Sequence, residues 1–158
     1  MSTTTESMPT VRPKQFHFPV AVEWIGGRRV AAGVQGKPPI DIAPPPVFRG
    51  TDPDLWSPED FLVAAAASCL AITFTGLAAR DDVAYERLRV EADGVAGARS
   101  DGCFGFIRIL LRMTVVGVDV ERIRQLAEKA EETCLVSASL DLPVELEIEV
   151  VRRSDVRS

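Results

Sequence analysis

Two cysteines are the residues of this chain best suited to chemistry, and each belongs to an apolar helical run. Cys69 lies within residues 57–70, and Cys134 lies within residues 127–137. Neither has histidine or cysteine neighbours at the spacing of a zinc site, so we expect no bound metal. A thiol in such a setting is either a small hydrophobic residue of the core or one half of a redox pair. The spacing alone leaves both interpretations open.

The redox interpretation requires a cation near the reactive thiol. An ordinary cysteine has a pKa near 8.5, so only about 3% is thiolate at neutral pH, and the thiolate is the nucleophile. The candidate cations are Arg28, Arg29 and Arg49. A second thiol helps because it converts a sulfenic acid into a disulfide. The third cysteine, Cys103, and the only histidine, His17, are interpreted as structural.

Two helices are predicted to position the cysteines. Ser57 is a helix N-cap with Pro58 at the first helical position, and the helix then runs to about Arg80. Its centre is apolar nearly all round, which predicts burial on every side. Asp119 caps a second helix over residues 120–134, which has apolar residues along one face.

Alternating β-forming residues predict the strands that support these helices. A first hairpin turns at Gly26-Gly27, and two long strands are joined by a glycine-rich turn at residues 97–102. The order of elements predicts an α+β fold in which an antiparallel sheet carries two main helices on one face. The predicted strands are residues 16–24, 28–34, 40–42, 85–96, 104–116 and 143–151.

Length and composition limit the class of protein. With 158 residues and a hydrophobic fraction of 46%, the chain can form one domain with a substantial core. We interpret residues 1–14 as a disordered arm and residues 15–158 as that domain. The net charge of −5 argues against a nucleic-acid partner. No run matches a membrane span or a signal core, and three cysteines without framework spacing fit a reducing cytoplasm.

The helix that carries Cys69 resembles the central helix of the OsmC/Ohr family, which comprises osmotically inducible protein C and the organic hydroperoxide resistance proteins. Glu59, in the run Ser57-Pro58-Glu59, lies ten residues before Cys69, as a glutamate does in that family. Cys134 follows 65 residues after Cys69 and precedes a short segment that ends in a serine. Gly26-Gly27-Arg28 is similar to the segment that carries the family's catalytic arginine. The resemblance covers about residues 16–152.

The resemblance implies a thiol-dependent peroxidase that reduces organic hydroperoxides to alcohols without a bound cofactor. It assigns Cys69 as the attacking thiol and Cys134 as the thiol that resolves the sulfenic acid. Arg28, oriented by Glu59, would activate the thiolate. The resemblance also implies a dithiol reductant of the lipoyl type and a homodimer as the functional unit.

Parts of the sequence differ from the better-known branches of that family and keep other functions open. Leu135 stands where a proline often follows the second cysteine, and residues 42–56 form a proline-rich run of their own. The alternatives are a non-catalytic protein that binds a small molecule or lipid, and a thiol redox sensor. Phe48, Trp56 and Phe61 are predicted to line an apolar pocket mouth suited to bulky hydroperoxides.

Helix geometry leads to a prediction about assembly. Ten residues advance a helix by about 15 Å and leave two side chains about 80° apart around it, so Glu59 cannot reach Cys69 of its own chain. The resemblance implies an intertwined homodimer whose central helices pack between the sheets. We therefore expect an isologous two-fold dimer in which Glu59 of one chain serves Cys69 of the other.

Overall fold

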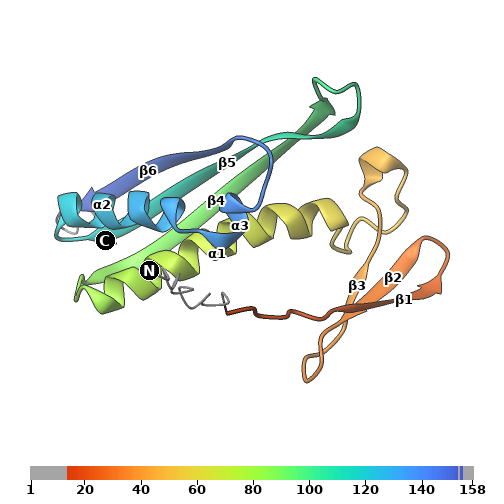
Figure 1. Cartoon of the computed structure of the whole chain (residues 1–158), viewed down its shortest axis with the longest axis horizontal. Coiled ribbons are helices and arrows are strands. Elements are labelled where there is room, and N and C mark those ends of the chain that lie inside the picture. Colours follow the sequence, from red (N-terminus) through yellow and green to blue (C-terminus); the bar gives the residue numbers. More distant parts are fainter. Residues whose placement is uncertain (1–13, 153, 155–158) are drawn as a thin grey trace, which may run out of the picture.

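The structure, a computed structural model, describes residues 14–152 and residue 154, and contains two three-stranded sheets (Figure 1). The small sheet is formed by β1 (Ala21–Gly26), β2 (Arg29–Gly33) and β3 (Ile40–Ile42). The large sheet is formed by β4 (Tyr85–Ala98), β5 (Phe104–Gly117) and β6 (Val144–Arg152). The helices are α1 (Pro58–Arg80), α2 (Val120–Glu132), α3 (Leu135–Ala138) and the 3-10 helix η1 (Pro46–Phe48). The predicted α+β class and order of elements are confirmed.

Some predicted boundaries differ from the structure. The first strand begins at Ala21 instead of residue 16, and the second main helix ends at Glu132, so that Cys134 follows it and caps α3. The predicted disordered arm, residues 1–14, lies outside the described residues except for Lys14. The boundaries of the single domain at residues 15–158 stay a prediction.

The N-terminus of α1 is fixed by reciprocal hydrogen bonds. The backbone N–H of Asp60 donates to the Ser57 hydroxyl oxygen at 3.1 Å, and the N–H of Ser57 donates to the Asp60 carboxylate at 2.8 Å. Both groups would otherwise be unpaired backbone donors of the first turn, so this capping box sets the start of the helix. The predicted N-cap at Ser57 and the predicted end at Arg80 are confirmed.

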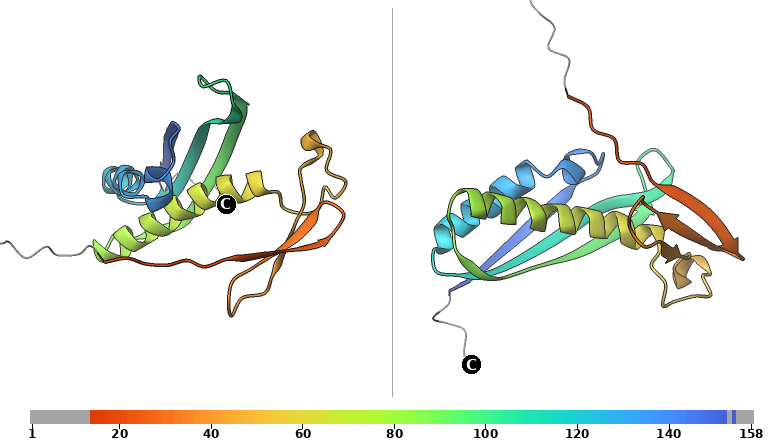
Figure 2. Two further views of the ribbon diagram at one scale, coloured as in Figure 1. Left: turned by 45° about the vertical axis from the view of Figure 1, so that its right-hand side comes forward. Right: turned by 90° about the horizontal axis from the view of Figure 1, so that it is seen from below.

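The large sheet is mixed, which corrects the prediction of an antiparallel sheet. β4 and β5 form a long antiparallel hairpin, as expected, but β6 runs parallel to β5. The reason is the connection: α2 and α3 cross back over the sheet, so the chain re-enters it from the same end as β5 (Figure 2). Two antiparallel neighbours would need only a tight turn, whereas this crossover spans two helices.

The core lies between the large sheet and two helices that cover one of its faces (Figure 2). α1 contributes residues at four-residue spacing, and β5 contributes alternate residues, as an inward helix face and an inward strand face require. The opposite face of the sheet is charged, with the Arg112 guanidinium 3.0 Å from the Glu147 carboxylate. The buried core residues are Ala66, Leu70, Phe74, Ala78, Ile109, Leu111, Met113, Val115, Ile123, Leu126, Ala127 and Ala130.

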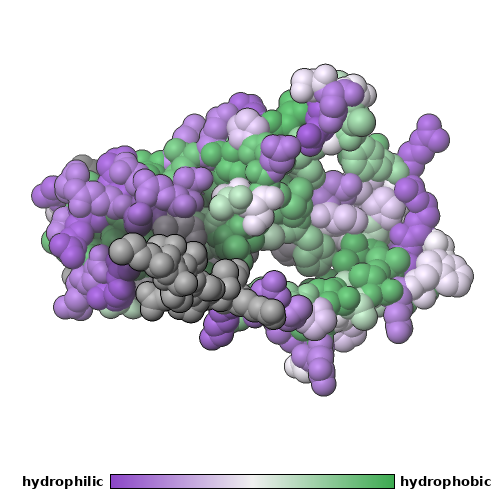
Figure 3. All heavy atoms as spheres, in the orientation of Figure 1, coloured by the Kyte–Doolittle hydropathy of each residue, from purple (hydrophilic) through white to green (hydrophobic). Residues whose placement is uncertain are grey.

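A large apolar surface stays open in the single chain. Ile72 on α1 is 70% exposed, and on β1 Trp24 is 73% and Val22 59% exposed. Apolar side chains border the open space between the small sheet and the body in Figure 3. The prediction that α1 is buried on every side is therefore wrong for one chain alone, because only one face of α1 packs on the sheet. Surfaces of this kind usually mark an interaction site.

Candidate active site

The structure brings Cys69 and Cys134 together, although they lie on different elements. The Cys134 thiol, the backbone N–H groups of Val136 and Leu135 and the Thr73 hydroxyl all hydrogen-bond to the Cys69 sulfur. Burial is the largest single influence and by itself raises the pKa of Cys69. The hydrogen bonds together outweigh it, so the pKa of Cys69 lies below the ordinary value of a cysteine. More of this thiol is therefore ionised at neutral pH.

The two thiols differ in access to solvent. Both are free, but Cys69 is half-buried while Cys134 is fully buried. Cys134 is the N-cap residue of α3, and the hydroxyl of the buried Ser137 donates to its sulfur at 3.3 Å. A reagent from solution therefore reaches Cys69 more easily than Cys134, and Cys134 is placed to react with Cys69 afterwards.

Arg28 and Glu59 lie together in a second place, at the N-terminal end of α1. They line a cavity of about 340 Å³ between the small sheet, the proline-rich loop and the start of the helix. The neighbouring Arg29 instead points to Asp52, with 3.8 Å between Nη1 and the carboxylate oxygen. Among the candidate arginines of the sequence, Arg28 is thus the one that shares a cavity with Glu59.

Glu59 carries an unpaired oxygen in this cavity. Its Oε2 atom is buried and has no hydrogen-bond partner within residues 14–152 and 154. A buried carboxylate oxygen without a partner is costly, so it marks a place where a donor is expected. Arg28 and Glu59 share the cavity, yet no ion pair joins them in the described part of the chain.

The structure does not bring these two groups of residues together within one chain. Glu59 and Cys69 lie on the same straight helix, ten residues apart. At about 1.5 Å per residue, their backbones are separated by about 15 Å along the axis, which exceeds the reach of a glutamate. Within one chain, the Arg28–Glu59 cavity therefore lies at the N-terminus of α1, and the thiol pair lies near the middle of the helix.

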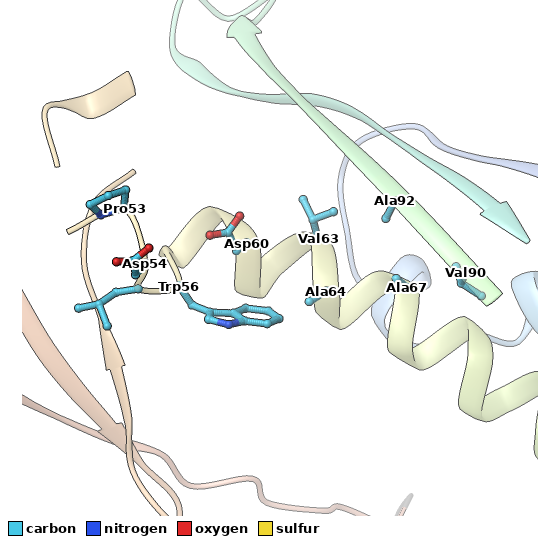
Figure 4. Close-up of a pocket in the computed structure, with 10 residues that line it drawn as sticks. Pro53, Asp54, Trp56, Asp60, Val63, Ala64, Ala67, Val90 and Ala92 are labelled. Atoms are coloured by element: carbon cyan, nitrogen blue, oxygen red, sulfur yellow. The ribbon is translucent and has the colours of Figure 1, made fainter. Parts of the chain in front are cut away.

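The aromatic residues predicted to line one pocket mouth lie along three separate hollows. Phe48 lines the Arg28 cavity. Trp56 lines a cavity of about 520 Å³ beside the first turns of α1, opposite Val90 and Ala92 of β4 (Figure 4). Phe61, whose ring centroid is 5.3 Å from that of Trp56, lines an apolar hollow of about 470 Å³ under the small sheet.

The remaining candidates take no part in either group. Cys103 is exposed in the turn between β4 and β5, where its backbone N–H donates to Asp101 at 2.9 Å. His17 is exposed on the segment before β1. Within the described residues no cluster of three or more His, Cys, Asp or Glu side chains is placed to hold a metal ion.

Three features of the thiol site were not found from the sequence. Thr73 lies four residues after Cys69 and so on the same helix face, a spacing that could have identified it. The N–H groups of Leu135 and Val136 point at Cys69 because α3 begins there, and no side-chain pattern signals that turn. Ser137 was part of the motif, but its hydrogen bond to Cys134 was not predicted.

Comparison with known proteins identifies the fold. The structure matches that of an OsmC-like protein of unknown function from Vibrio cholerae with a TM-score of 0.78 and 21% identity, covering 85% of this chain and 99% of that one. An organic hydroperoxide resistance protein from Elizabethkingia anophelis matches with a TM-score of 0.73 and 20% identity, over 89% and 99% of the two chains. The organic hydroperoxide resistance protein OhrB of Bacillus subtilis matches with a TM-score of 0.63 and 22% identity, over 86% and 98%.

Sequence comparison agrees with the structural matches. The uncharacterized protein YmaD of Bacillus subtilis is 29% identical over 140 residues, which cover 84% of this chain and 92% of that protein. The family model described as OsmC-like protein matches residues 51–149, more than half of the chain. This chain therefore belongs to the OsmC-like protein family.

Proposed function

We propose that this protein is a thiol-dependent peroxidase that reduces organic hydroperoxides to alcohols. The observation that carries the proposal is the contact between Cys69, a half-buried thiol with a lowered pKa, and the buried thiol of Cys134. A nucleophile that is ionised and accessible, with a second thiol in reach, is what a two-cysteine peroxidase needs. Two proteins of the same fold carry the name organic hydroperoxide resistance protein, which supports this chemistry here.

The proposed reaction has three steps. The Cys69 thiolate attacks the distal oxygen of the hydroperoxide, so that an S–O bond forms while the O–O bond breaks, and the leaving alkoxide takes a proton from water to become an alcohol. Cys134 then attacks the resulting sulfenic acid, which forms the disulfide and releases water. A dithiol reductant of the lipoyl type exchanges with this disulfide and is itself oxidised to a disulfide. No bound cofactor takes part.

Arg28 and Glu59 complete the site from a second subunit in this proposal. The guanidinium would stabilise the thiolate and the negative charge that develops as the O–O bond breaks, and Glu59 would orient it. The open apolar faces of α1 and of the small sheet support a homodimer, because a second copy would cover them. An antiparallel pairing of the two α1 helices would bring Glu59 of each chain towards Cys69 of the other.

The proposal also covers the location of the protein and its partners. By length and hydropathy α1 could cross a bilayer, but one of its faces already packs in the core of the chain, as that of a core helix does. We place the protein in the cytoplasm, with the hydroperoxide, the dithiol and a second copy as its partners. Its net charge of −5 disfavours nucleic acid as a partner.

Stopped-flow oxidation tests the proposal. Reduced protein is mixed with cumene hydroperoxide or hydrogen peroxide, and free thiols and consumed peroxide are measured with a dithiol present. We expect multiple turnovers for the wild type and for Cys103→Ser, and none for Cys69→Ser. Undiminished turnover in Cys69→Ser would refute the catalytic assignment, whereas a wild type that loses no thiol would indicate a non-catalytic binding protein. A protein whose thiols are oxidised once, and whose disulfide no dithiol then reduces, would indicate a redox sensor.

A further inference from the structure

The guanidinium of Arg28 is held by a loop that is distant in the sequence. Its Nη1 atom donates to the main-chain oxygen of Phe48 at 2.9 Å and to that of Arg49 at 3.3 Å. These two carbonyls lie at the end of the 3-10 helix η1, where carbonyl groups lack partners within the helix. A cation with planar donors is therefore well matched to this helix end.

The loop that supplies these carbonyls is tightly built. Its own backbone closes it: the N–H groups of Phe48 and Gly50 donate to the Pro45 oxygen at 2.9 and 3.1 Å, and that of Arg49 donates to Pro46. Arg49 has a φ of 60°, the left-handed conformation that ends a helix. A Cβ atom at Gly50 would lie 1.7 Å from the Pro44 oxygen, about half of the ordinary contact distance of 3.4 Å. Only glycine therefore fits at this position without a shift of the Pro44 backbone.

A contact from the large sheet fixes the loop from its other side. The Phe48 ring meets the Phe104 ring edge-on, with centroids 6.1 Å apart and planes at 85°. Phe104 is the first residue of β5, and the loop stands near the tip of the β4–β5 hairpin in Figure 1. The edge-to-face arrangement is a favourable geometry for an aromatic pair. The loop is thus tied both to the small sheet and to the large one.

We propose that the loop Pro44–Gly50, held against Phe104, is the positioning element that aims Arg28 at the Glu59 cavity. An arginine has five N–H donors, and the loop uses only the Nη1 group. Among residues 14–152 and 154 the Nη2 and Nε donors have no partner, and they form the edge that can bind a carboxylate bidentately. Glu59 lines the same cavity with a buried, unpaired Oε2, so it presents the matching acceptor. This inference rests on the proposed role of Arg28 as the cation that serves Cys69.

A double-mutant cycle tests this positioning role. Gly50→Ala forces residue 50 away from the Pro44 oxygen and so distorts the loop, and Phe104→Leu removes the aromatic contact more gently. Phe104→Tyr is the conservative variant that should behave like the wild type. Each change is made with Arg28 present and with Arg28→Ala, in a Cys103→Ser background so that the exposed thiol does not interfere. The readouts are the pH profile of Cys69 alkylation by iodoacetamide and the rate of Cys69 oxidation by cumene hydroperoxide. A melting temperature for each variant reports the folded state.

We expect the loop variants to act only through Arg28. With Arg28 present, Gly50→Ala should slow Cys69 oxidation on the order of tenfold to a hundredfold, since a displacement of about 1 Å in a reacting constellation costs that much. Its alkylation profile should also move to higher pH. With Arg28→Ala, neither loop variant should have a further effect. Equal losses in both backgrounds, or no loss with Arg28 present, would overturn the positioning role.

The alkylation profile separates this inference from the proposed function. It needs no peroxide, so an Arg28-dependent shift in a protein that does not reduce hydroperoxides would support the loop's role while refuting the peroxidase. Turnover that depends on Cys69 but does not change in the loop variants would support the peroxidase and refute the positioning role of the loop.

Discussion

The geometry of α1 makes a quantitative prediction about mixed subunits. Glu59 and Cys69 are about 15 Å apart along one helix, so a site that needs both must draw them from two chains. Glu59→Ala and Cys69→Ser should each inactivate the homodimer. In a heterodimer of the two, one site combines both changes and the other combines an intact Glu59 with an intact Cys69.

The size of the recovery follows from counting sites. If equal amounts of the two variants exchange at random, about half of the dimers are heterodimers, and each has one working site of two. The mixture should therefore regain about a quarter of the wild-type activity per subunit, from two parents that have almost none. A site built within one chain predicts no recovery at all, because every chain carries one of the two defects.

The assay combines peroxide consumption with a measure of subunit exchange. The two variants carry different affinity tags, and tandem purification isolates the heterodimer, which should have about half of the wild-type rate. Mixing either variant with itself is the control. If the purified heterodimer is inactive, the shared site is refuted, and so is the antiparallel pairing of α1 from which we derived it.

Further predictions concern the thiol site. Cys134→Ser should leave one rapid turnover and a sulfenic acid that dimedone traps, because the attacking thiol is intact. Thr73→Val removes a hydrogen bond that favours the thiolate, so the pKa of Cys69 should rise and its alkylation profile should move to higher pH. Thr75→Val is the matched control, since that hydroxyl donates to the Ile72 carbonyl at 2.8 Å instead. Ser137→Ala should slow disulfide formation and spare the first oxidation, as separate stopped-flow phases would report. Cumene hydroperoxide should react faster than hydrogen peroxide, and the reverse order would count against an apolar substrate site.

Local signals in the sequence were enough to predict the strands and the two main helices, although not the short helices η1 and α3. Ser57, Pro58 and Asp60 define the start of α1 through short-range hydrogen bonds and backbone geometry, which depend only on neighbouring residues. The direction of β6 relative to β5 depends instead on which end of the sheet the chain reaches after a 26-residue connection. The alternation of apolar and polar residues within residues 143–151 is the same for a parallel and an antiparallel strand. Strand direction was therefore the part of the topology most open to error.

The candidate site divides in the same way. The spacing of Glu59, Cys69 and Cys134 follows the chain, so a motif could reveal it. Which arginine shares a cavity with Glu59 depends on contacts across the fold: Arg29 pairs with Asp52, while Arg28 donates to the carbonyls of the proline-rich loop. No spacing rule describes such a choice, because the partners come from segments that meet only after folding.

The ionisation of Cys69 shows why its environment matters more than its position in a motif. Burial against the core disfavours the thiolate, and among the described residues of one chain the groups that oppose it are neutral donors: the Cys134 thiol, the Thr73 hydroxyl and two backbone N–H groups. Those donors already lower the pKa of Cys69, with no cation from the described part of the chain contributing. A guanidinium arriving from a second subunit would act in the same direction, because an opposite charge nearby favours the ionised form. Dissociation of the dimer should therefore raise the pKa of Cys69 towards the value set by the neutral donors alone. Alkylation profiles measured across protein concentrations that span the dimer equilibrium would detect this rise, and a profile independent of concentration would mean that no charge from the second subunit reaches Cys69.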